Sequence, residues 1–374
     1  MWVLAPLFAA LASSSFVKRE GSNLVLDGKP FRFAGANCYW LGLDENVKNA
    51  TTGSKVGYPT DFRVDDALAT AAEMGANVVR AHTVGFSTGN AALSYEGSLG
   101  RFNDAAAERM DYAIAAAAKH GIRLVLPLTD NYAYYHGGKH DFVDWAGITG
   151  EPATSCVLPA SVKEQQAKKC AFYSDGGVIS SFRAYMRRLV TRVNRYTGVA
   201  LADDPAILAW ETGNELVGVP PQWTANISAF LKGELAVKQL VMDGRDGVRM
   251  GLKDGALSIP DVDMITDHYY MDLDKSAVPT FMSPDAAAAA AAGKVFTVGE
   301  VRAPLLLLLR VLLAACHCLA SLTRTALPGR VAPRAVRVEP REPHVLPRIG
   351  ARQQCCGWRY VLEPAPARRP ARLR

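Results

Sequence analysis

The sequence predicts an α/β protein, a (β/α)8 barrel of parallel strands whose eighth strand is missing or replaced by an unrelated tail. Short strands that are apolar on both faces alternate with helical segments, the pattern of a parallel sheet covered by helices. Seven such units occupy about 270 residues, which suits a barrel better than a doubly wound sheet. No G-x-G-x-x-G motif follows the first strand, so a dinucleotide-binding fold is not expected.

Apolar runs, helical spacing and turn residues place the individual elements. The expected strands are residues 31–37, 77–80, 123–128, 207–210, 239–242, 264–266 and 295–298. The expected helices are residues 62–75, 104–121, 178–196 and 284–293. Polar and aromatic residues gather just after the strands, on the barrel face where active sites lie.

Charge is unevenly distributed along the chain. The whole sequence has a formal net charge of +6, but residues 301–374 hold 14 Arg and three Glu, a net charge of +11. The first 300 residues therefore carry a net charge of −5. Because the basic residues are confined to the tail, nucleic acid is not an expected partner.

The chain divides into a signal peptide at residues 1–15, a folded body at residues 16–300 and a tail at residues 301–374. The tail is rich in Arg and Pro and has no Lys or Asp, a bias that favours an aberrant segment made by frameshift or mis-splicing. A genuine disordered basic tail is the alternative. Residues 305–322 are apolar, but Arg310 interrupts them, so no membrane association is expected.

Several features predict a secreted, extracellular protein. The N-terminal run MWVLAPLFAALASSS ends in the small residues of a cleavage site, and sequons at Asn49 and Asn226 are consistent with export. Cys156 and Cys170 flank a polar loop, and a disulfide between them suits an exported protein. Cys38 lies in an apolar strand and is expected to be a buried thiol.

Two glutamates end predicted strands. In ILAWETGNELVG a strand runs into Asn214-Glu215, and in VFTVGE another strand ends at Glu300. A carboxyl group can protonate a leaving oxygen while a neighbouring amide holds a substrate hydroxyl. Two carboxylates at a barrel mouth suit retaining glycoside hydrolysis, which needs them about 5 Å apart. We therefore predict that Glu215 and Glu300 are catalytic.

Other strand ends supply candidate substrate-binding residues. A guanidinium at Arg80 could orient the nucleophilic carboxylate and keep it ionised. The hydroxyl of Tyr270 could donate to Glu300, and aromatic rings near a cleft can stack on sugar faces. The predicted substrate-binding set is Trp40, Arg80, Asn131, Asn214, His268 and Tyr270.

A histidine pair follows the third predicted strand. His136 and His140 are four residues apart with Asp141 beside them, in a Gly-rich loop. Metal binding is one interpretation of this pair, but contacts with sugar or solvent are the favoured interpretation. No metal and no cofactor are expected.

These residues together resemble glycoside hydrolase family 5 of clan A, in particular its secreted mannan endo-1,4-beta-mannosidase branch. The resemblance covers roughly residues 16–300 and is carried by FRFAGANCYWLGLDENV, YPTDFRVDDALATAAEMGANVVRAH, MDYAIAAAAKHGIRLVLPLTDNYAYYHGG, DDPAILAWETGNELVG, DHYY and VFTVGE. It implies an eight-stranded TIM barrel with Glu215 as the acid/base and Glu300 as the nucleophile. The supporting active-site positions that it implies are Arg80, Asn214, His268 and Tyr270. Family members continue past the nucleophile with an eighth strand and a Trp beneath the sugar, and no matching segment follows here.

The resemblance implies a secreted, monomeric, retaining endo-glycoside hydrolase that cleaves β-1,4-mannosidic bonds in mannan-type polysaccharides. Two alternatives stay open. The mannanase branch typically has Arg, an aromatic residue and a Trp–Gly pair at strand two, where this chain has Arg80-Ala81-His82-Thr83, so a related β-1,4-glucan hydrolase is one alternative. A barrel without strand eight keeps open edges, so an inactive carbohydrate-binding remnant is the other.

Overall fold

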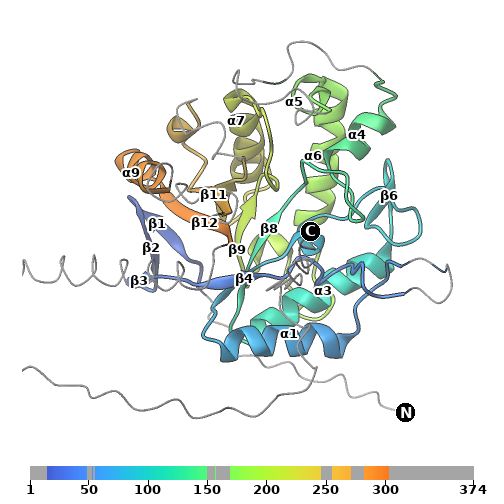
Figure 1. Ribbon diagram of the computed structural model, residues 1–374, viewed down its shortest axis with the longest axis horizontal. Coiled ribbons are helices and arrows are strands. Elements are labelled where there is room, and N and C mark those ends of the chain that lie inside the picture. Colours follow the sequence, from blue (N-terminus) through green and yellow to red (C-terminus); the bar gives the residue numbers. More distant parts are fainter. Residues whose placement is uncertain are drawn as a thin grey trace, which may run out of the picture.

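Seven parallel strands form one curved sheet, a nearly closed barrel with helices packed around it (Figure 1). The computed structural model describes residues 15–48, 53, 55–149, 156, 169–245, 255–270 and 282–302. The barrel strands are β4 (Gly35–Asn37), β5 (Val78–Arg80), β8 (Arg123–Pro127), β9 (Ile207–Glu211), β10 (Leu240–Asp243), β11 (Met264–Tyr270) and β12 (Val295–Arg302). Their order is β12-β11-β10-β9-β8-β5-β4, so each strand pairs with its neighbour in the chain, as in a (β/α)8 barrel.

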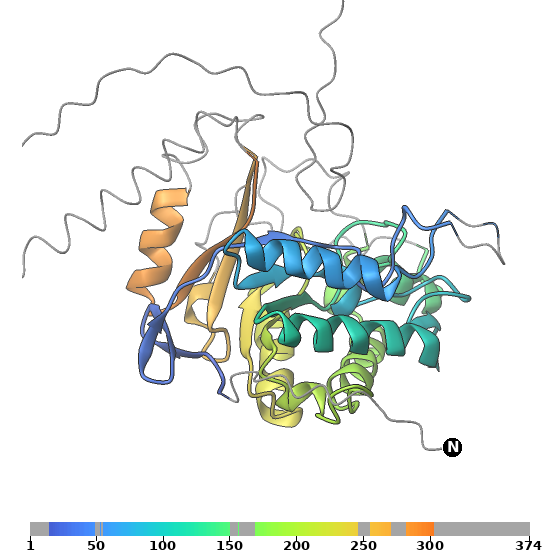
Figure 2. The same ribbon diagram turned by 90° about the horizontal axis from the view of Figure 1, so that it is seen from below.

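The helices lie outside the sheet, and α1 and α3 run side by side (Figure 2). The helices are α1 (Asp61–Glu73), α2 (His82–Gly85), α3 (Asp104–Lys119), α4 (Lys139–Trp145), α5 (Ala171–Ser174), α6 (Gly176–Val190), α7 (Pro221–Ala229) and α9 (Ser283–Ala291). Shorter helical turns are η2 (Leu201–Asp203), η3 (Phe230–Glu234) and η4 (Ala256–Ser258). Side-chain caps explain where the long helices begin, because Thr60, Asn103 and Asp175 each accept a hydrogen bond from a first-turn backbone N–H.

Two small antiparallel sheets accompany the barrel. One contains β1 (Lys18–Glu20), β2 (Asn23–Leu26) and β3 (Lys29–Phe31), and the other pairs β6 (Glu96–Ser98) with β7 (Arg101–Phe102). Arg19 bonds to Asp263 and to the carbonyl of Gly293, which lie just before β11 and β12. The first small sheet therefore sits against the amino end of the barrel, opposite the end where the strands deliver their polar residues.

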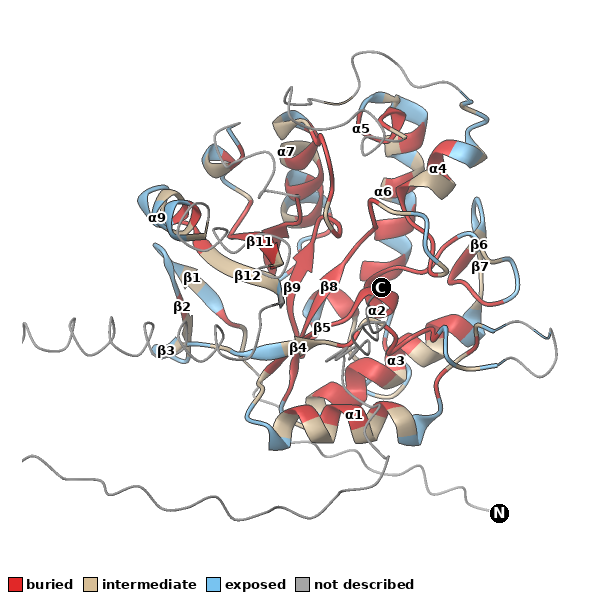
Figure 3. Cartoon of the chain, in the orientation of Figure 1, coloured by how far each residue is buried: buried red, intermediate tan, exposed pale blue. Residues whose placement is uncertain are grey.

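Most of the apolar core lies in two clusters. One fills the barrel and includes Val78, Ala209 and Met264, while the larger one lies between the strands and the helices. Trp210 belongs to the larger cluster, is fully buried and donates from Nε1 to Gln239. The central barrel strands β5, β8, β9, β10 and β11 are buried along most of their length, whereas the edge strands β4 and β12 are partly exposed (Figure 3).

The barrel has a seam between β4 and β12. Within the described ranges no eighth strand pairs with either edge. The amide of Asn37 crosses the seam and donates from Nδ2 to the carbonyl oxygen of Gly299 at 2.9 Å. A cavity of about 60 Å³ lies behind it, lined by residues of both edge strands and of β5, β8 and β10.

Most predicted elements are present, and two differ for local reasons. The predicted strand 31–37 is two strands, because Asp27 and Gly28 adopt left-handed conformations that turn the chain and pair Phe31 with Leu24. The predicted helix 178–196 ends at Val190. Beyond it, the side chain of Asn194 accepts from two backbone N–H groups and Asp111 captures the N–H of Arg195, so these groups do not continue the helix.

The cysteine predictions are confirmed. Cys156 and Cys170 form a disulfide, and Cys38 is buried and is not part of that disulfide. Among the described residues, no helix combines the length and the apolar character needed to cross a bilayer. The predicted signal peptide at residues 1–15 lies outside the described residues except for residue 15. The predicted tail at residues 301–374 lies outside them except for its first two residues.

Candidate active site

Polar side chains from four strands converge at the carboxyl end of the barrel. Parallel strands deliver their carboxyl ends to one face, so residues far apart in the sequence become neighbours there. The structure brings together six of the predicted residues, namely Arg80, Asn214, Glu215, His268, Tyr270 and Glu300. Hydrogen bonds join Arg80, Asn214, Tyr270 and Glu300. A separate hydrogen bond joins His268 to Glu215, and His268 lies 3.8 Å from Glu300.

Arg80 is the centre of this group. Its guanidinium donates to Asn214 Oδ1 at 2.8 Å and to Glu300 Oε1 at 3.0 Å. A second pair of bonds, both 2.7 Å, runs from Nε and Nη2 to the two oxygens of Glu211. Burial alone would lower the pKa of Arg80, but the charge of Glu211 and of the other carboxylates outweighs it and raises that pKa. Arg80 is therefore a permanent cation in a fixed orientation.

Glu300 is held as a carboxylate. Arg80 donates to its Oε1, and the hydroxyl of Tyr270 makes a short hydrogen bond to its Oε2. Burial alone would raise the pKa of Glu300, but the charges of His268 and Arg80 and the bond from Tyr270 outweigh burial, and the net shift is downward. An ionised carboxylate is the form that can act as a nucleophile.

Glu215 and Glu300 both approach the same ring nitrogen of His268. Nδ1 of His268 lies 2.7 Å from Glu215 Oε1 and 3.8 Å from Glu300 Oε1. Burial alone would lower the pKa of His268, but the hydrogen bond with Glu215 and the charge of Glu300 raise it overall. One oxygen each of Glu215 and Glu300 and a ring nitrogen of His268 lie within 4.8 Å of one another, so the two carboxyl groups face each other.

The backbone is specialised at both glutamates. Glu215 has a φ of +49°, a left-handed conformation that is unfavourable for a residue with a side chain. On β12 the register skips Gly299, so that His268 pairs directly with Glu300. A Cβ at Gly299 would lie 2.6 Å from His268 Nε2, so only glycine fits this bulge. The bulge turns Glu300 toward the other polar groups.

Two predicted residues lie outside this group. Trp40 is 5% exposed and packs beneath Arg63, whose guanidinium carbon is 4.1 Å from the ring centre. Asn131 is 9% exposed, and its Oδ1 accepts from Lys139 Nζ and from the backbone N–H of Val217. A substrate-binding role for these two residues stays a prediction.

Sequence reasoning missed Glu211 and Asn37. Glu211 is fully buried and lies two residues after Ala209, so strand alternation places both side chains on the inner face of the barrel. That alternation, applied to the run ILAWE, could have found it. Asn37 ends β4 and its Oδ1 accepts from Arg80 at 3.2 Å. Its partners lie more than 40 residues away, and no local pattern indicates them.

Fold and site together define a class of protein. A parallel (β/α)8 barrel with two facing glutamates at its carboxyl end is the arrangement found in barrel glycoside hydrolases. Residues 14–271 match the family model described as GH family 5 beta-mannosidase-like, so the chain belongs to glycoside hydrolase family 5. The match includes Arg80, Glu215 and His268 and ends before β12, which carries Glu300.

Two of the curated relatives are plant mannan endo-1,4-beta-mannosidases. Mannan endo-1,4-beta-mannosidase 2 of Oryza sativa subsp. japonica is 34% identical over 249 residues, which are 64% of this chain and 49% of that protein. Mannan endo-1,4-beta-mannosidase 2 of Arabidopsis thaliana is 32% identical over 240 residues, covering 62% of this chain and 49% of that protein. The chain spans about half the length of the curated relatives that it matches.

Solved structures agree on the fold. The endo-1,4-beta-mannanase from Rhizomucor miehei superposes with a TM-score of 0.60 at 26% identity, covering 77% of this chain and 82% of that one. The glycoside hydrolase family 5 mannosidase from the same organism gives a TM-score of 0.61 at 22% identity, over 77% of this chain and 73% of that one. Both support the (β/α)8 architecture.

Proposed function

We propose that this chain is a retaining endo-glycoside hydrolase that cleaves β-1,4-mannosidic bonds in mannan-type polysaccharides. The observation that carries the proposal is the approach of Glu215 and Glu300 to within 4.8 Å. Retaining enzymes place their carboxyl groups about 5 Å apart, whereas inverting enzymes leave room for a water molecule between them. Mannan as the substrate is taken from the relatives, whose names describe mannan endo-1,4-beta-mannosidases.

The proposed reaction has two displacements. In the first, a carboxylate oxygen of Glu300 attacks the anomeric carbon while the glycosidic bond breaks and its oxygen takes the proton of Glu215. In the second, Glu215 takes a proton from water, the water oxygen bonds to the anomeric carbon, and the ester bond to Glu300 breaks. Arg80 and Tyr270 hold Glu300 in place through both steps.

The remaining polar groups orient the reactants. Arg80 fixes the amide of Asn214 by bonding to its Oδ1, and Nδ2 of the same amide donates one hydrogen to Asp130 Oδ2 at 3.2 Å. The second hydrogen on Nδ2 can meet a sugar hydroxyl. His268 lies within hydrogen-bond distance of Glu215 and holds its carboxyl group in position. We propose residues 16–300 as the catalytic unit.

The test is hydrolysis of galactomannan by the purified full chain, measured as new reducing ends. We expect activity in the parent chain and a loss of about 1,000-fold or more in Glu215→Gln and in Glu300→Gln. Asp203→Asn is a matched control, because Asp203 pairs with Lys238 at the surface. Proton NMR of the first product should show the β-anomer, and an α-anomer would contradict the retaining mechanism.

The open seam favours a second candidate, an inactive carbohydrate-binding remnant. Within the described ranges β4 and β12 have unpaired outer edges, and full closure is what fixes the geometry of a barrel. Binding of mannan without new reducing ends, together with activity in a version that supplies an eighth strand, would establish the remnant. A higher rate on β-1,4-glucan than on mannan would establish the glucan hydrolase instead.

We further propose that the protein is secreted and monomeric. The disulfide between Cys156 and Cys170 supports an oxidising compartment. The protein should be recovered from the culture medium of a eukaryotic host, and light scattering should give the mass of one chain.

A further inference from the structure

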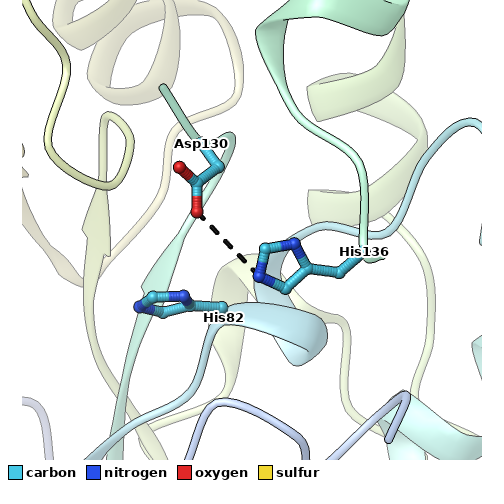
Figure 4. A group of neighbouring side chains, drawn as sticks. All are labelled: His82, Asp130 and His136. Atoms are coloured by element: carbon cyan, nitrogen blue, oxygen red, sulfur yellow. Dashed lines mark ion pairs between the residues drawn. The ribbon is translucent and has the colours of Figure 1, made fainter. Parts of the chain in front are cut away.

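A second cluster of ligand-type side chains lies beside the catalytic group. His82 follows β5, Asp130 follows β8, and His136 lies on the loop before α4 (Figure 4). One carboxylate oxygen of Asp130 and one ring nitrogen of each histidine lie within 4.8 Å of one another. The side chains of Figure 4 point toward a common centre, and Asp130 Oδ2 is 3.9 Å from His136 Nε2. The proposed hydrolysis uses none of the three.

The spacing suits a small divalent cation. A zinc ion with bonds of about 2.0–2.2 Å would separate tetrahedral ligands by roughly 3.4 Å. Asp130 Oδ2 and His136 Nε2, which are 3.9 Å apart, therefore need to close in by about 0.5 Å. The His82 nitrogen lies within 4.8 Å of both and needs to close in by at most about 1.4 Å. Nε2 of His82 faces Arg80 Nη1 at 2.9 Å, which leaves Nδ1 of that ring for the cation. The three residues are 7%, 0% and 3% exposed, so a bound ion would be shielded from solvent.

The ligands are already held in place by their neighbours. The backbone N–H of Tyr132 donates to Asp130 Oδ1 at 2.8 Å, which orients the carboxylate and keeps Oδ2 toward the histidines. The ring of His136 packs against those of Phe86 and Tyr135, with centroids 5.0 and 4.8 Å away. Metal sites rely on such outer contacts to fix the direction of each ligand.

The charge around the cluster also allows a cation. Arg80 adds positive charge nearby, but it is paired with Glu211 and Glu300. Imidazoles bind a metal in the neutral form and a carboxyl group in the ionised form, so metal binding releases any proton that these ligands carry.

We propose that His82, Asp130 and His136 bind one divalent first-row transition ion, with Zn²⁺ as the best match. Two imidazoles and one carboxylate are the donor set that zinc accepts, with water or the second carboxylate oxygen completing the coordination. The ion would fasten the loop of residues 130–136 to the end of β5. It would be separate from the Glu215–His268–Glu300 group, and its presence does not depend on the proposed hydrolysis.

The test measures binding directly on the full chain. Metal-free protein is titrated with Co²⁺, and binding is measured by the visible ligand-field absorption of Co²⁺ and by equilibrium dialysis. Zn²⁺ is then added as a competitor. We expect one Co²⁺ per chain, displaced by Zn²⁺. Saturating Zn²⁺ should raise the melting temperature by about 5 °C.

Three variants locate the ion. His136→Gln removes one proposed ligand and should weaken Co²⁺ binding at least about tenfold. His82→Gln removes a second proposed ligand and serves as an independent test. His140→Gln is the matched control, because His140 lies in the first turn of α4, four residues from His136 and outside the cluster, and this variant should bind as the parent does. Glu300→Gln should also bind normally. Circular dichroism without metal verifies that each variant folds.

Each contrary result is decisive. Absence of Co²⁺ and Zn²⁺ binding would identify the cluster as a hydrogen-bonded packing group. Equal binding by His136→Gln, His82→Gln and the parent would also overturn the proposal. Loss of binding in Glu300→Gln would assign the ion to the catalytic group. A chain that binds metal but hydrolyses nothing would refute the proposed function and leave this inference standing.

Discussion

Glu211 grips the guanidinium of Arg80 with both carboxylate oxygens, at 2.7 Å each, from a position that is fully buried. The pair joins β9 to β5 across the strand β8 that separates them. A bidentate pair fixes the plane of the guanidinium as well as its position. Because it fixes that plane, Glu211 determines the directions in which Arg80 donates hydrogen bonds to Asn214 and Glu300.

Glu211→Gln should therefore destabilise the fold. It removes one charge of a buried pair and leaves Arg80 with a weaker partner, which costs about 3 kcal/mol in the free energy of unfolding. Urea denaturation at neutral pH measures the change. Asp203→Asn breaks an exposed pair with Lys238 and should cost less than about 1 kcal/mol. Equal effects of the two substitutions would show that the pair with Arg80 has no special role.

The left-handed backbone of Glu215 can be tested by comparing two substitutions. Glu215→Ala and Glu215→Gly remove the same contact with His268, but only glycine adopts a φ of +49° without strain. We expect the glycine variant to be more stable than the alanine variant by about 1 kcal/mol in urea denaturation. The reverse order, which is usual in helices, would show that the site relaxes out of this conformation.

His268 should make stability depend on pH. Its pKa is raised in the folded state, so its contribution is complete below the unfolded value of 6.5 and is lost as the pH rises through the folded pKa. The urea midpoint should therefore fall as the pH rises above about 6.5. His268→Asn should flatten this part of the profile. If His268→Asn kept the parent's dependence of the urea midpoint on pH, that dependence would come from another titratable group.

Gly299→Ala should reduce activity more than stability. The new Cβ would lie 2.5 Å from Thr266 Oγ1 and 2.6 Å from His268 Nε2, which shifts His268 and Glu300 relative to each other. A displacement of this size costs about 100-fold in kcat for the proposed mannan hydrolysis. Gly176→Ala is the control, because nothing lies near its added Cβ. An unchanged kcat in Gly299→Ala would show that the bulge does not position the nucleophile.

The sequence predicted the barrel because its strands are local apolar runs and their order follows the chain. The same reasoning grouped Arg80, Glu215, His268, Tyr270 and Glu300, since each ends a strand and parallel strands share one face. The structure brings these side chains into contact.

What the sequence did not predict depends on contacts between distant segments. His136 was paired with His140 on the basis of spacing, whereas the fold places it with His82 and Asp130. That grouping depends on how the loop before α4 returns over the barrel, which no local pattern specifies. The early end of α6 depends in the same way on Asp111, which lies 84 positions before Arg195.

We expect unfolding to begin at the seam between β4 and β12. A closed ring of strands shares hydrogen bonds on both sides of every member, but here two neighbours are joined by the side chain of Asn37 alone in the described part of the chain. Amide hydrogens at this seam should exchange with deuterium before those of β8 and β9, whose two edges are both paired. Glu300, the proposed nucleophile, is carried by the strand that borders the seam, so local opening there would disconnect Glu300 from Arg80 while the rest of the barrel stays intact.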